Sequence, residues 1–244
     1  MNLTKVKGII IKETPYKDND KIVTILTDKL GKISCLAKGA KKNNSPILAS
    51  SQYLVYSEFV LYKGTSFYQI NSANVLLTFY NFRVDFDKLQ IAFELTKIIQ
   101  QVTDENQDTE QVLKLFLNTI YALDNLDKDK RIIVTAFKIR LFAILGFAPV
   151  ISRCNQCLND LTNKKDNEKI TIYYDYVSNV FLCSECIAGK DMKRYIKVNE
   201  ATIVAIRYVC LTDIKKIFSF DIKDIENFNL FGQVYTDTMI NGLY

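Results

Sequence analysis

The sequence contains no histidine and no tryptophan, and only 8 glycines and 3 prolines occur among its 244 residues. Without histidine, a Ser-His-Asp or Cys-His catalytic arrangement cannot form, and neither can a histidine-containing zinc protease site or a zinc finger with two histidine ligands. The low glycine and proline content argues against a collagen-like or linker-rich chain. A hydrophobic fraction of 48% is far above that of a disordered chain. The chain is therefore globular, and it is long enough for one large domain or two to three small ones.

A long uncharged apolar stretch is also missing. The best candidate, residues 139–151, is interrupted by Arg140 and Pro149 and is too short and too polar for a membrane span. The apolar run at residues 8–11 is too short for a signal peptide and lies between charged residues. These features predict a soluble, cytoplasmic protein without a membrane partner, whose six cysteines remain reduced.

The first 80 residues have the pattern of a small β-barrel. Five segments rich in β-branched and aromatic residues are separated by turn signals, and no long helical period lies between them. Five strands in so short a segment favour a closed or nearly closed barrel, and an SH3-like barrel also fits the pattern. The predicted strands are 6–13, 21–28, 32–38, 52–63 and 67–76.

From residue 81 onward, apolar residues recur at helical spacing, which predicts helices at 86–102, 109–123, 131–145, 200–211 and 225–243. Asp108 with Gln111 is a helix start signal, Gly146 with Pro149 is a stop signal, and Asn199 is an N-cap candidate. Three consecutive helices with short connections indicate an all-α bundle. The last two helices are expected to pack on the same bundle, so the segment between is an insertion.

That inserted segment carries two CxxC pairs, Cys154 with Cys157 and Cys183 with Cys186, separated by 25 residues. Each pair directs two thiolates to one point, and two pairs complete the tetrahedron that Zn²⁺ prefers. Because sulfur fills all four positions, the predicted zinc is structural. The apolar runs at 170–174 and 179–182 predict a hairpin, as in a zinc ribbon. Four unrelated buried cysteines and a redox CxxC are the alternatives.

Together these patterns predict an α+β multidomain protein, in which an N-terminal β-barrel precedes an all-α helical bundle with an inserted zinc-binding segment of four cysteines. The predicted boundaries are a barrel at 1–80, a helical domain at 81–150, a zinc-binding insertion at 151–190, and the C-terminal part of the helical domain at 191–244.

Positive charge is concentrated in the predicted barrel. Residues 1–42 contain ten lysines and four acidic residues, whereas the rest of the chain is close to neutral. Lys38, Lys41 and Lys42 surround Gly39 in a predicted turn. Lysines neutralise phosphates and aromatic rings stack on bases, so a basic barrel can bind nucleic acid. A solvated turn with surface lysines is the alternative interpretation.

Three motifs, in this order, resemble the RecO family of bacterial recombination mediators. Residues 8–64, with GKISCLAKGAKK (31–42), resemble its opening strands and basic turn; LFAILGFAPVISRCNQC (141–157) resembles a helix that ends in L-G-F-x-P before a CxxC; and FLCSEC (181–186) resembles the second CxxC. Leu158 stands where a glycine often follows the first CxxC, and Ser178 and Asn179 replace a glycine pair. The turns of the two pairs are therefore expected to differ in shape, with intact ligands. The C-terminal third matches poorly.

The resemblance implies an N-terminal OB-fold, a helical domain and a zinc-binding insertion. It also implies a protein that binds single- and double-stranded DNA, anneals complementary strands and, with RecR, helps to load recombinase onto DNA coated by single-strand binding protein. Such a protein needs no catalytic residues and works in the cytoplasm, associated with the nucleoid. We expect DNA contacts first at Lys38, Lys41 and Lys42, and more weakly at Lys21 and Lys32.

Two other classes of function fit parts of the sequence. An adaptor whose main role is protein binding could use a groove lined by Phe116, Tyr121 and Phe137, although core positions are the simpler interpretation. An enzyme could use one of two carboxylate clusters to bind Mg²⁺, as some nucleases do. These clusters lie around a turn and before a helix, where solvated acidic groups are common. They are Asp18, Asp20 and Asp28, and Asp104, Glu105 and Asp108.

Overall fold

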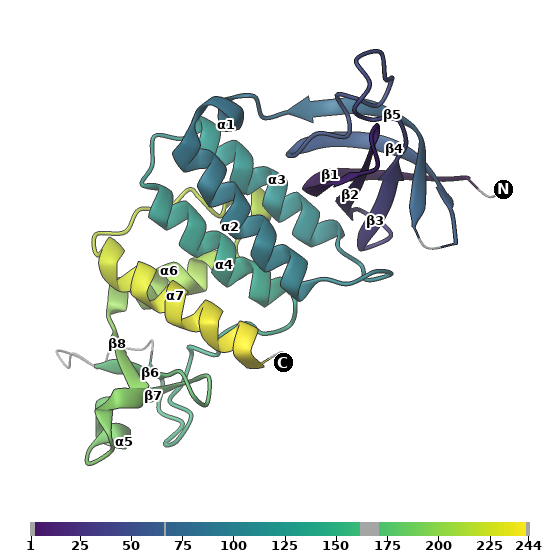
Figure 1. Cartoon of the computed structure of the whole chain (residues 1–244). Coiled ribbons are helices and arrows are strands. Elements are labelled where there is room, and N and C mark those ends of the chain that lie inside the picture. Colours follow the sequence, from purple (N-terminus) through teal and green to yellow (C-terminus); the bar gives the residue numbers. More distant parts are fainter. Residues whose placement is uncertain (1–2, 66, 162–170, 243–244) are drawn as a thin grey trace. The chain divides into compact units, whose positions relative to one another are not determined.

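The computed structural model describes residues 3–65, 67–161 and 171–242, and it contains two compact units, Met1–Asn125 and Leu126–Tyr244 (Figure 1). The first unit holds five strands followed by three helices. The second holds helices and a small three-stranded sheet.

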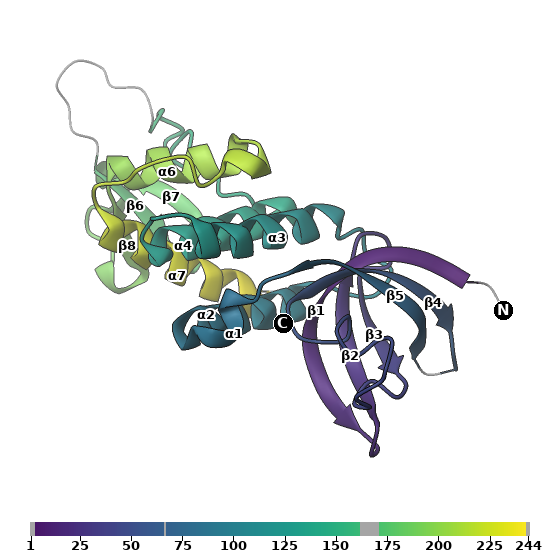
Figure 2. The same cartoon turned by 90° about the horizontal axis from the view of Figure 1, so that it is seen from above.

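The five strands of the first unit form a closed barrel with the order β1-β2-β3-β5-β4. Neighbouring strands are antiparallel except β3 and β5, which pair in parallel. A five-stranded Greek-key barrel of this kind is an OB-fold, whose strands curl around one another in Figure 2. The strands are β1 (Leu3–Tyr16), β2 (Asp20–Thr27), β3 (Lys32–Ala37), β4 (Val55–Lys63) and β5 (Tyr68–Thr78).

The barrel core is filled by the inward-facing residues of each strand. In β4, buried and half-buried residues alternate, as they must when one face of a strand points into the barrel. In β1, a bulge between Ile10 and Lys12 interrupts this alternation, so that three consecutive isoleucines are buried. The core residues are Val6, Ile10, Val23, Ile25, Ile33, Cys35, Ala37, Ala40, Ile47, Phe59, Leu61, Tyr68 and Ile70.

Three helices complete the first unit: α1 (Asn81–Val84), α2 (Phe86–Val102) and α3 (Glu110–Asn125). The segment between α2 and α3 is bonded to the barrel, because the carbonyl of Asp104 accepts from Lys32 N at 3.1 Å. A Cβ atom on Gly31 would lie 2.1 Å from that carbonyl, so only glycine fits there. The buried hydroxyl of Thr109 donates to the carbonyl of Thr27 at 2.7 Å. These bonds attach the helices to the β2–β3 turn.

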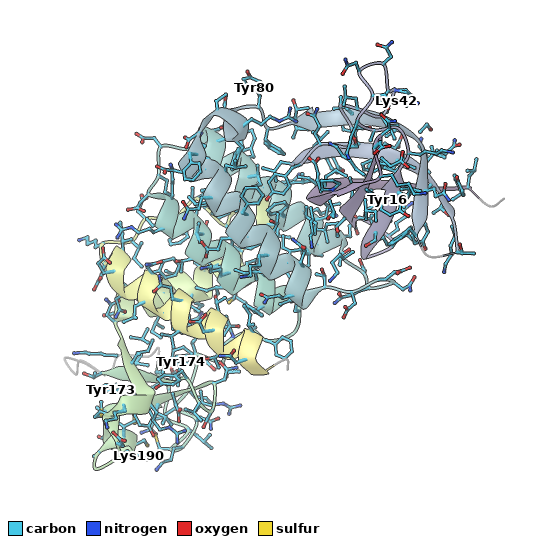
Figure 3. All side chains as sticks on the ribbon, viewed as in Figure 1. Tyr16, Lys42, Tyr80, Tyr173, Tyr174 and Lys190 are labelled. Atoms are coloured by element: carbon cyan, nitrogen blue, oxygen red, sulfur yellow. The ribbon has the colours of Figure 1, made fainter. Side chains whose placement is uncertain are left out.

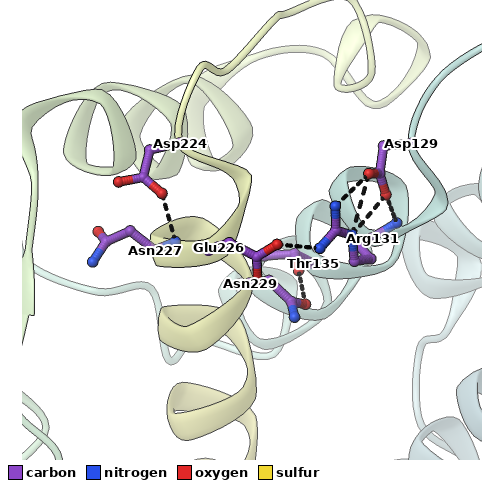
Figure 4. Close-up of polar contacts among 7 residues, drawn as sticks. All are labelled: Asp129, Arg131, Thr135, Asp224, Glu226, Asn227 and Asn229. Atoms are coloured by element: carbon purple, nitrogen blue, oxygen red, sulfur yellow. Dashed lines mark hydrogen bonds and ion pairs between the residues drawn. The ribbon is translucent and has the colours of Figure 1, made fainter.

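In the second unit, α7 (Ile225–Gly242) packs along α4 (Lys130–Ile144), and α6 (Glu200–Leu211) contacts both. Figure 4 shows polar contacts between the first turns of α4 and α7. The guanidinium of Arg131 bonds to Asp129 and to Glu226, and Thr135 bonds to Asn229 at 3.2 Å. These contacts fix the register of the two helices.

The small sheet of the second unit has the order β7-β6-β8 and is antiparallel throughout. Tyr174 on its inner face lies 5.2 Å, between ring centroids, from both Phe181 and Phe231, and so joins the sheet to α7. The remaining elements are β6 (Ile172–Asp175), β7 (Val180–Cys183), α5 (Ser184–Ile187), η1 (Met192–Arg194), β8 (Tyr195–Val198) and η2 (Ile214–Lys216).

The predicted fold class is confirmed: an N-terminal OB-fold precedes helices, and the SH3-like alternative is wrong. The predicted strands and helices recur with shifts of a few residues, and Asn199 caps α6 through a 2.8 Å bond from Thr202 N. The predicted hairpin is present from Ile172 onward, with residue 170 outside the described part, as is residue 243 of the last predicted helix.

The predicted helical segment 81–150 belongs partly to each compact unit, since the division falls after Asn125. The assignment of functional domains stays a prediction. Among the described residues, no helix combines the length and the apolar character that are needed to cross a membrane.

Candidate metal centre and nucleic-acid interface

The first CxxC forms a tight turn in front of the small sheet. Leu158 N donates to the carbonyl of Cys154 at 2.9 Å, and Asn155 N donates to the carbonyl of Phe181 on β7 at 2.9 Å. Leu158 has φ = +66°, in the left-handed region that favours glycine. The backbone therefore has the conformation for which glycine is best suited, although a leucine occupies the position.

The second CxxC begins at the last residue of β7 and continues into α5, which places Cys183 and Cys186 on one turn. Asn179, in the β6–β7 turn, also has a left-handed φ of +53°, and its side chain accepts a 2.8 Å bond from the Tyr174 hydroxyl. Asparagine tolerates this conformation better than leucine. The expectation that the turns differ in shape is therefore wrong at these two positions, because both keep a left-handed conformation.

The four thiols converge on one point. All four sulfur atoms lie within 4.8 Å of one another, and Cys157 Sγ lies 3.7 Å from Cys183 Sγ. Four sulfurs bound to zinc at about 2.3 Å in a tetrahedron lie about 3.8 Å apart. In the part of the chain that the structure describes, this is the only group of three or more such side chains arranged to hold a metal. The donor set and spacing fit a tetrahedral metal ion.

The chain itself favours the thiolate at one of the four ligands. Burial raises the pKa of the Cys154 thiol, but the backbone amides of Cys157, Cys183 and Gln156 outweigh burial and lower that pKa to about 6. Cys183 N, for example, lies 3.4 Å from Cys154 Sγ. Burial and the neighbouring sulfurs raise the pKa of Cys186 to about 12. A cation is therefore needed to keep all four groups ionised at neutral pH.

A buried ion pair supports the sheet beside these cysteines. Asp175, whose side chain is only 5% exposed, binds Arg194, and its Oδ1 accepts from the amides of Val177 at 3.1 Å and Ser178 at 3.3 Å. This pair joins the β6–β7 turn to the start of β8. Sequence reasoning missed both residues, because no local signal links positions 19 apart whose contact depends on strand pairing.

On the barrel, the loop after β3 holds Lys38 and Lys42, both of which are exposed. Gly39 has φ = +69°, and its amide donates to Asp20 Oδ1 at 2.7 Å, which fixes the loop against the start of β2. Within the described residues, the ammonium groups of Lys38 and Lys42 bond to no other group. Lys42 lies at the edge of the barrel in Figure 3. These two lysines are available to a ligand.

The other three predicted lysines have partners inside the chain. Lys41 Nζ donates to the carbonyl of Lys17 at 2.9 Å, Lys21 pairs with Glu13 at 2.6 Å, and Lys32 bonds to the carbonyl of Gln100. Lys21 and Lys32 are half-buried, and both bonds tie parts of the first unit together. DNA contact by any of the five lysines stays a prediction.

The bond from Lys41 also brings the β1–β2 turn to this loop, and with it two residues that sequence reasoning missed. Lys17 is exposed, and its ammonium group lies 5.4 Å from the centre of the Tyr16 ring, which is labelled in Figure 3. A cation beside an exposed aromatic ring suits a nucleic-acid surface. The adjacent Tyr-Lys pair in a predicted turn was the only available signal.

The residues of the alternative hypotheses have structural surroundings. Phe116 and Phe137 are fully buried, so a groove that they line is wrong, while Tyr121 is 55% exposed. Asp28 accepts from Lys7 N at 3.0 Å, and Asp108 from Glu110 N at 3.1 Å at the start of α3. These carboxylates therefore stabilise turns and a helix end.

Comparison with known proteins gives two family matches. The model for the recombination protein O N terminus matches residues 1–79, and the model for its C terminus matches residues 83–226. A curated relative named DNA repair protein RecO, from Acetivibrio thermocellus, is 37% identical over 92% of this chain and 86% of its own length. Relatives of the same name from Caldicellulosiruptor saccharolyticus and Clostridium perfringens are 30% and 28% identical, over 93% and 100% of this chain and 88% and 94% of theirs.

Proposed function

Since the chain belongs to the RecO family of DNA repair proteins, we propose that it is a recombination mediator that binds single- and double-stranded DNA and anneals complementary strands. With RecR, it helps to load recombinase onto DNA coated by single-strand binding protein. It works in the cytoplasm, associated with the nucleoid, and it is not an enzyme. The barrel, residues 1–80, binds nucleic acid, and the segment 151–190 is the zinc-binding part of a helical domain formed by 81–150 and 191–244.

The observation that carries this proposal is the pair of exposed lysines, Lys38 and Lys42, on a fixed loop of an OB-fold. OB-folds bind single-stranded nucleic acid in grooves lined by cations and aromatic rings. Annealing requires two phosphate backbones to approach each other, and lysines reduce their repulsion without any covalent chemistry. Lys17 and Tyr16 extend the same surface.

The metal proposed for the four cysteines is zinc in a structural role. Four thiolates in a tetrahedron favour Zn²⁺ over oxygen-preferring cations, and they leave no open position for substrate. The two CxxC turns come from segments far apart in sequence, so the ion joins the first turn to β7 and α5. Metal binding of this kind contributes on the order of 10 kcal/mol to local folding.

The test is the salt dependence of single-strand binding by the full-length protein. A Lys38→Gln/Lys42→Gln variant removes two charges from the loop. Each lost phosphate contact on a single strand lowers the slope of log K against log salt by about 0.7, so the double variant should lower it by about 1.4. Fluorescence anisotropy of a labelled oligo(dT), measured from about 50 to 300 mM salt, gives both slopes.

A matched control removes two exposed lysines from helical and loop positions, Lys114→Gln with Lys223→Gln. This variant has the same net charge as the test variant and should keep the wild-type slope. Equal slopes for the wild type and the Lys38→Gln/Lys42→Gln variant remove this loop from the DNA-binding surface. Equal losses in the two variants mean that only total charge matters.

One observation favours the adaptor alternative, in which partner binding is the main role. Tyr80, Val84 and Phe86 are 66%, 69% and 77% exposed on one short segment around α1, and apolar residues exposed together often mark a protein interface. Pull-down with purified RecR, or with the C-terminal peptide of single-strand binding protein, tests this role. Loss of binding in a Tyr80→Ser/Phe86→Ser variant with unchanged DNA affinity supports it.

A further inference from the structure

A hollow of about 420 Å³ lies between β1, the residue that precedes β4, and α2, within the first unit. It is separate from the loop of Lys38 and Lys42. Two aromatic rings, Tyr53 and Phe93, and two lysines, Lys12 and Lys97, line it. None of these four residues has a part in the DNA-binding surface described above.

The two rings form a supported stack. Their centroids lie 4.7 Å apart and their planes differ by 18°. The Tyr53 hydroxyl bonds to Thr96 Oγ1 at 2.9 Å, and that hydroxyl group in turn bonds to the carbonyl of Phe93 at 3.1 Å. Tyr53 covers one side of the Phe93 ring, yet Phe93 is still 53% exposed. An aromatic surface is therefore held in a fixed orientation and left open on its outer side.

The charges around this ring are positive. Lys12 and Lys97 are exposed, and in the described ranges neither ammonium group has a partner. Lys97 follows Phe93 by one helical turn and so lies on the same face of α2. The nearest acidic groups are already engaged: Glu13 pairs with Lys21 and accepts from Tyr53 N, and Glu94 has a partner within the chain.

We propose that this hollow is a second contact for single-stranded DNA, in which an unpaired base stacks on Phe93 while Lys12 and Lys97 neutralise neighbouring phosphates. The inference rests on the proposed DNA-binding function and adds a stacking site to it. Every base has an apolar face, so the contact does not depend on sequence. In a duplex the base faces are covered by neighbouring pairs, so the site selects unpaired strands.

The absence of tryptophan from the chain provides a direct test. A Phe93→Trp variant of the full-length protein carries a single indole, whose fluorescence is quenched when a base stacks on it. The matched control is Phe86→Trp, on the same helix and 77% exposed but outside the hollow. Both variants are titrated with oligo(dT), while anisotropy of a labelled oligo(dT) reports binding independently.

The expected result is quenching in Phe93→Trp that saturates at the same oligo(dT) concentration as the anisotropy, with little change in Phe86→Trp. A Phe93→Ala variant should lose about 5- to 100-fold in affinity for oligo(dT), and Phe93→Tyr should retain it, because one stacked base contributes about 1–3 kcal/mol. Circular dichroism spectra that match the wild type show that the variants are folded.

Normal binding by anisotropy without quenching in Phe93→Trp overturns the inference and leaves the proposed function intact. Equal quenching in both tryptophan variants also overturns it, because the signal is then not specific to the hollow. If the wild type binds no oligo(dT) at all, the proposed function and this inference fail together.

Discussion

Leu158 stands in the left-handed backbone region directly after the first CxxC, and replacing it by glycine should strengthen zinc binding. A leucine at φ = +66° costs about 1–2 kcal/mol relative to a residue without a Cβ atom. The side chain is 63% exposed, so little apolar burial is lost with it. Glycine in turn raises the entropy of the unfolded chain, which costs about 0.4–1 kcal/mol. The net gain is about 0.5–1 kcal/mol.

This gain should appear in the zinc affinity, because the cysteine turns reach this geometry when they bind the ion. At about 1.4 kcal/mol per tenfold change, Leu158→Gly should bind zinc about two- to fivefold more tightly. Competition with a chromogenic chelator at fixed pH measures the two affinities. Leu158→Ala is the control, since it removes the side chain but keeps the Cβ atom and its strain. A gain in Leu158→Ala equal to that of Leu158→Gly, or weaker binding by Leu158→Gly, refutes the strain argument.

Two further predictions concern the second unit. Cys154→Ser should reduce the zinc content of the purified protein from about one equivalent to near zero and lower its melting temperature, whereas Cys210→Ser should keep the full equivalent; metal analysis and thermal denaturation measure both, and a fully loaded Cys154→Ser removes the zinc assignment. A Cβ atom on Gly232 would lie 2.5 Å from Thr135 Cγ2, so Gly232→Ala should destabilise the α4–α7 contact by about 1–3 kcal/mol, while Gly242→Ala, which meets nothing within 4 Å, should be neutral in urea denaturation.

Strands and helices were predictable where one face is buried along a regular period. The alternation in β4 and the helical spacing of α2 are both strong, and α2 begins and ends where the spacing predicts. The short strand β8 was not predicted, because it has four residues and depends on pairing with β6. The unit boundary after Asn125 was also not predicted. It follows from tertiary bonds such as Thr109 to Thr27, which join positions 82 apart.

The candidate site shows the same distinction between local and distant information. The metal ligands were predictable because two CxxC spacings carry the coordination chemistry themselves. The partners of Lys21 and Lys32 were not, because a lysine in a strand looks the same whether it faces solvent or a carbonyl 68 positions away. The stack of Tyr53 on Phe93 also depends on the fold, which brings a loop of the barrel against α2.

The central claim is that the protein anneals DNA strands through its barrel, and a strand-annealing assay measures this most directly. Complementary oligonucleotides, each coated with single-strand binding protein, are mixed with the full-length protein, with and without RecR, and duplex formation is followed by energy transfer between end labels. We predict faster annealing with the wild type than without protein, and a smaller acceleration by the Lys38→Gln/Lys42→Gln variant, while the Lys114→Gln/Lys223→Gln control matches the wild type. A wild-type rate equal to the rate without protein, in both arms, would contradict the account.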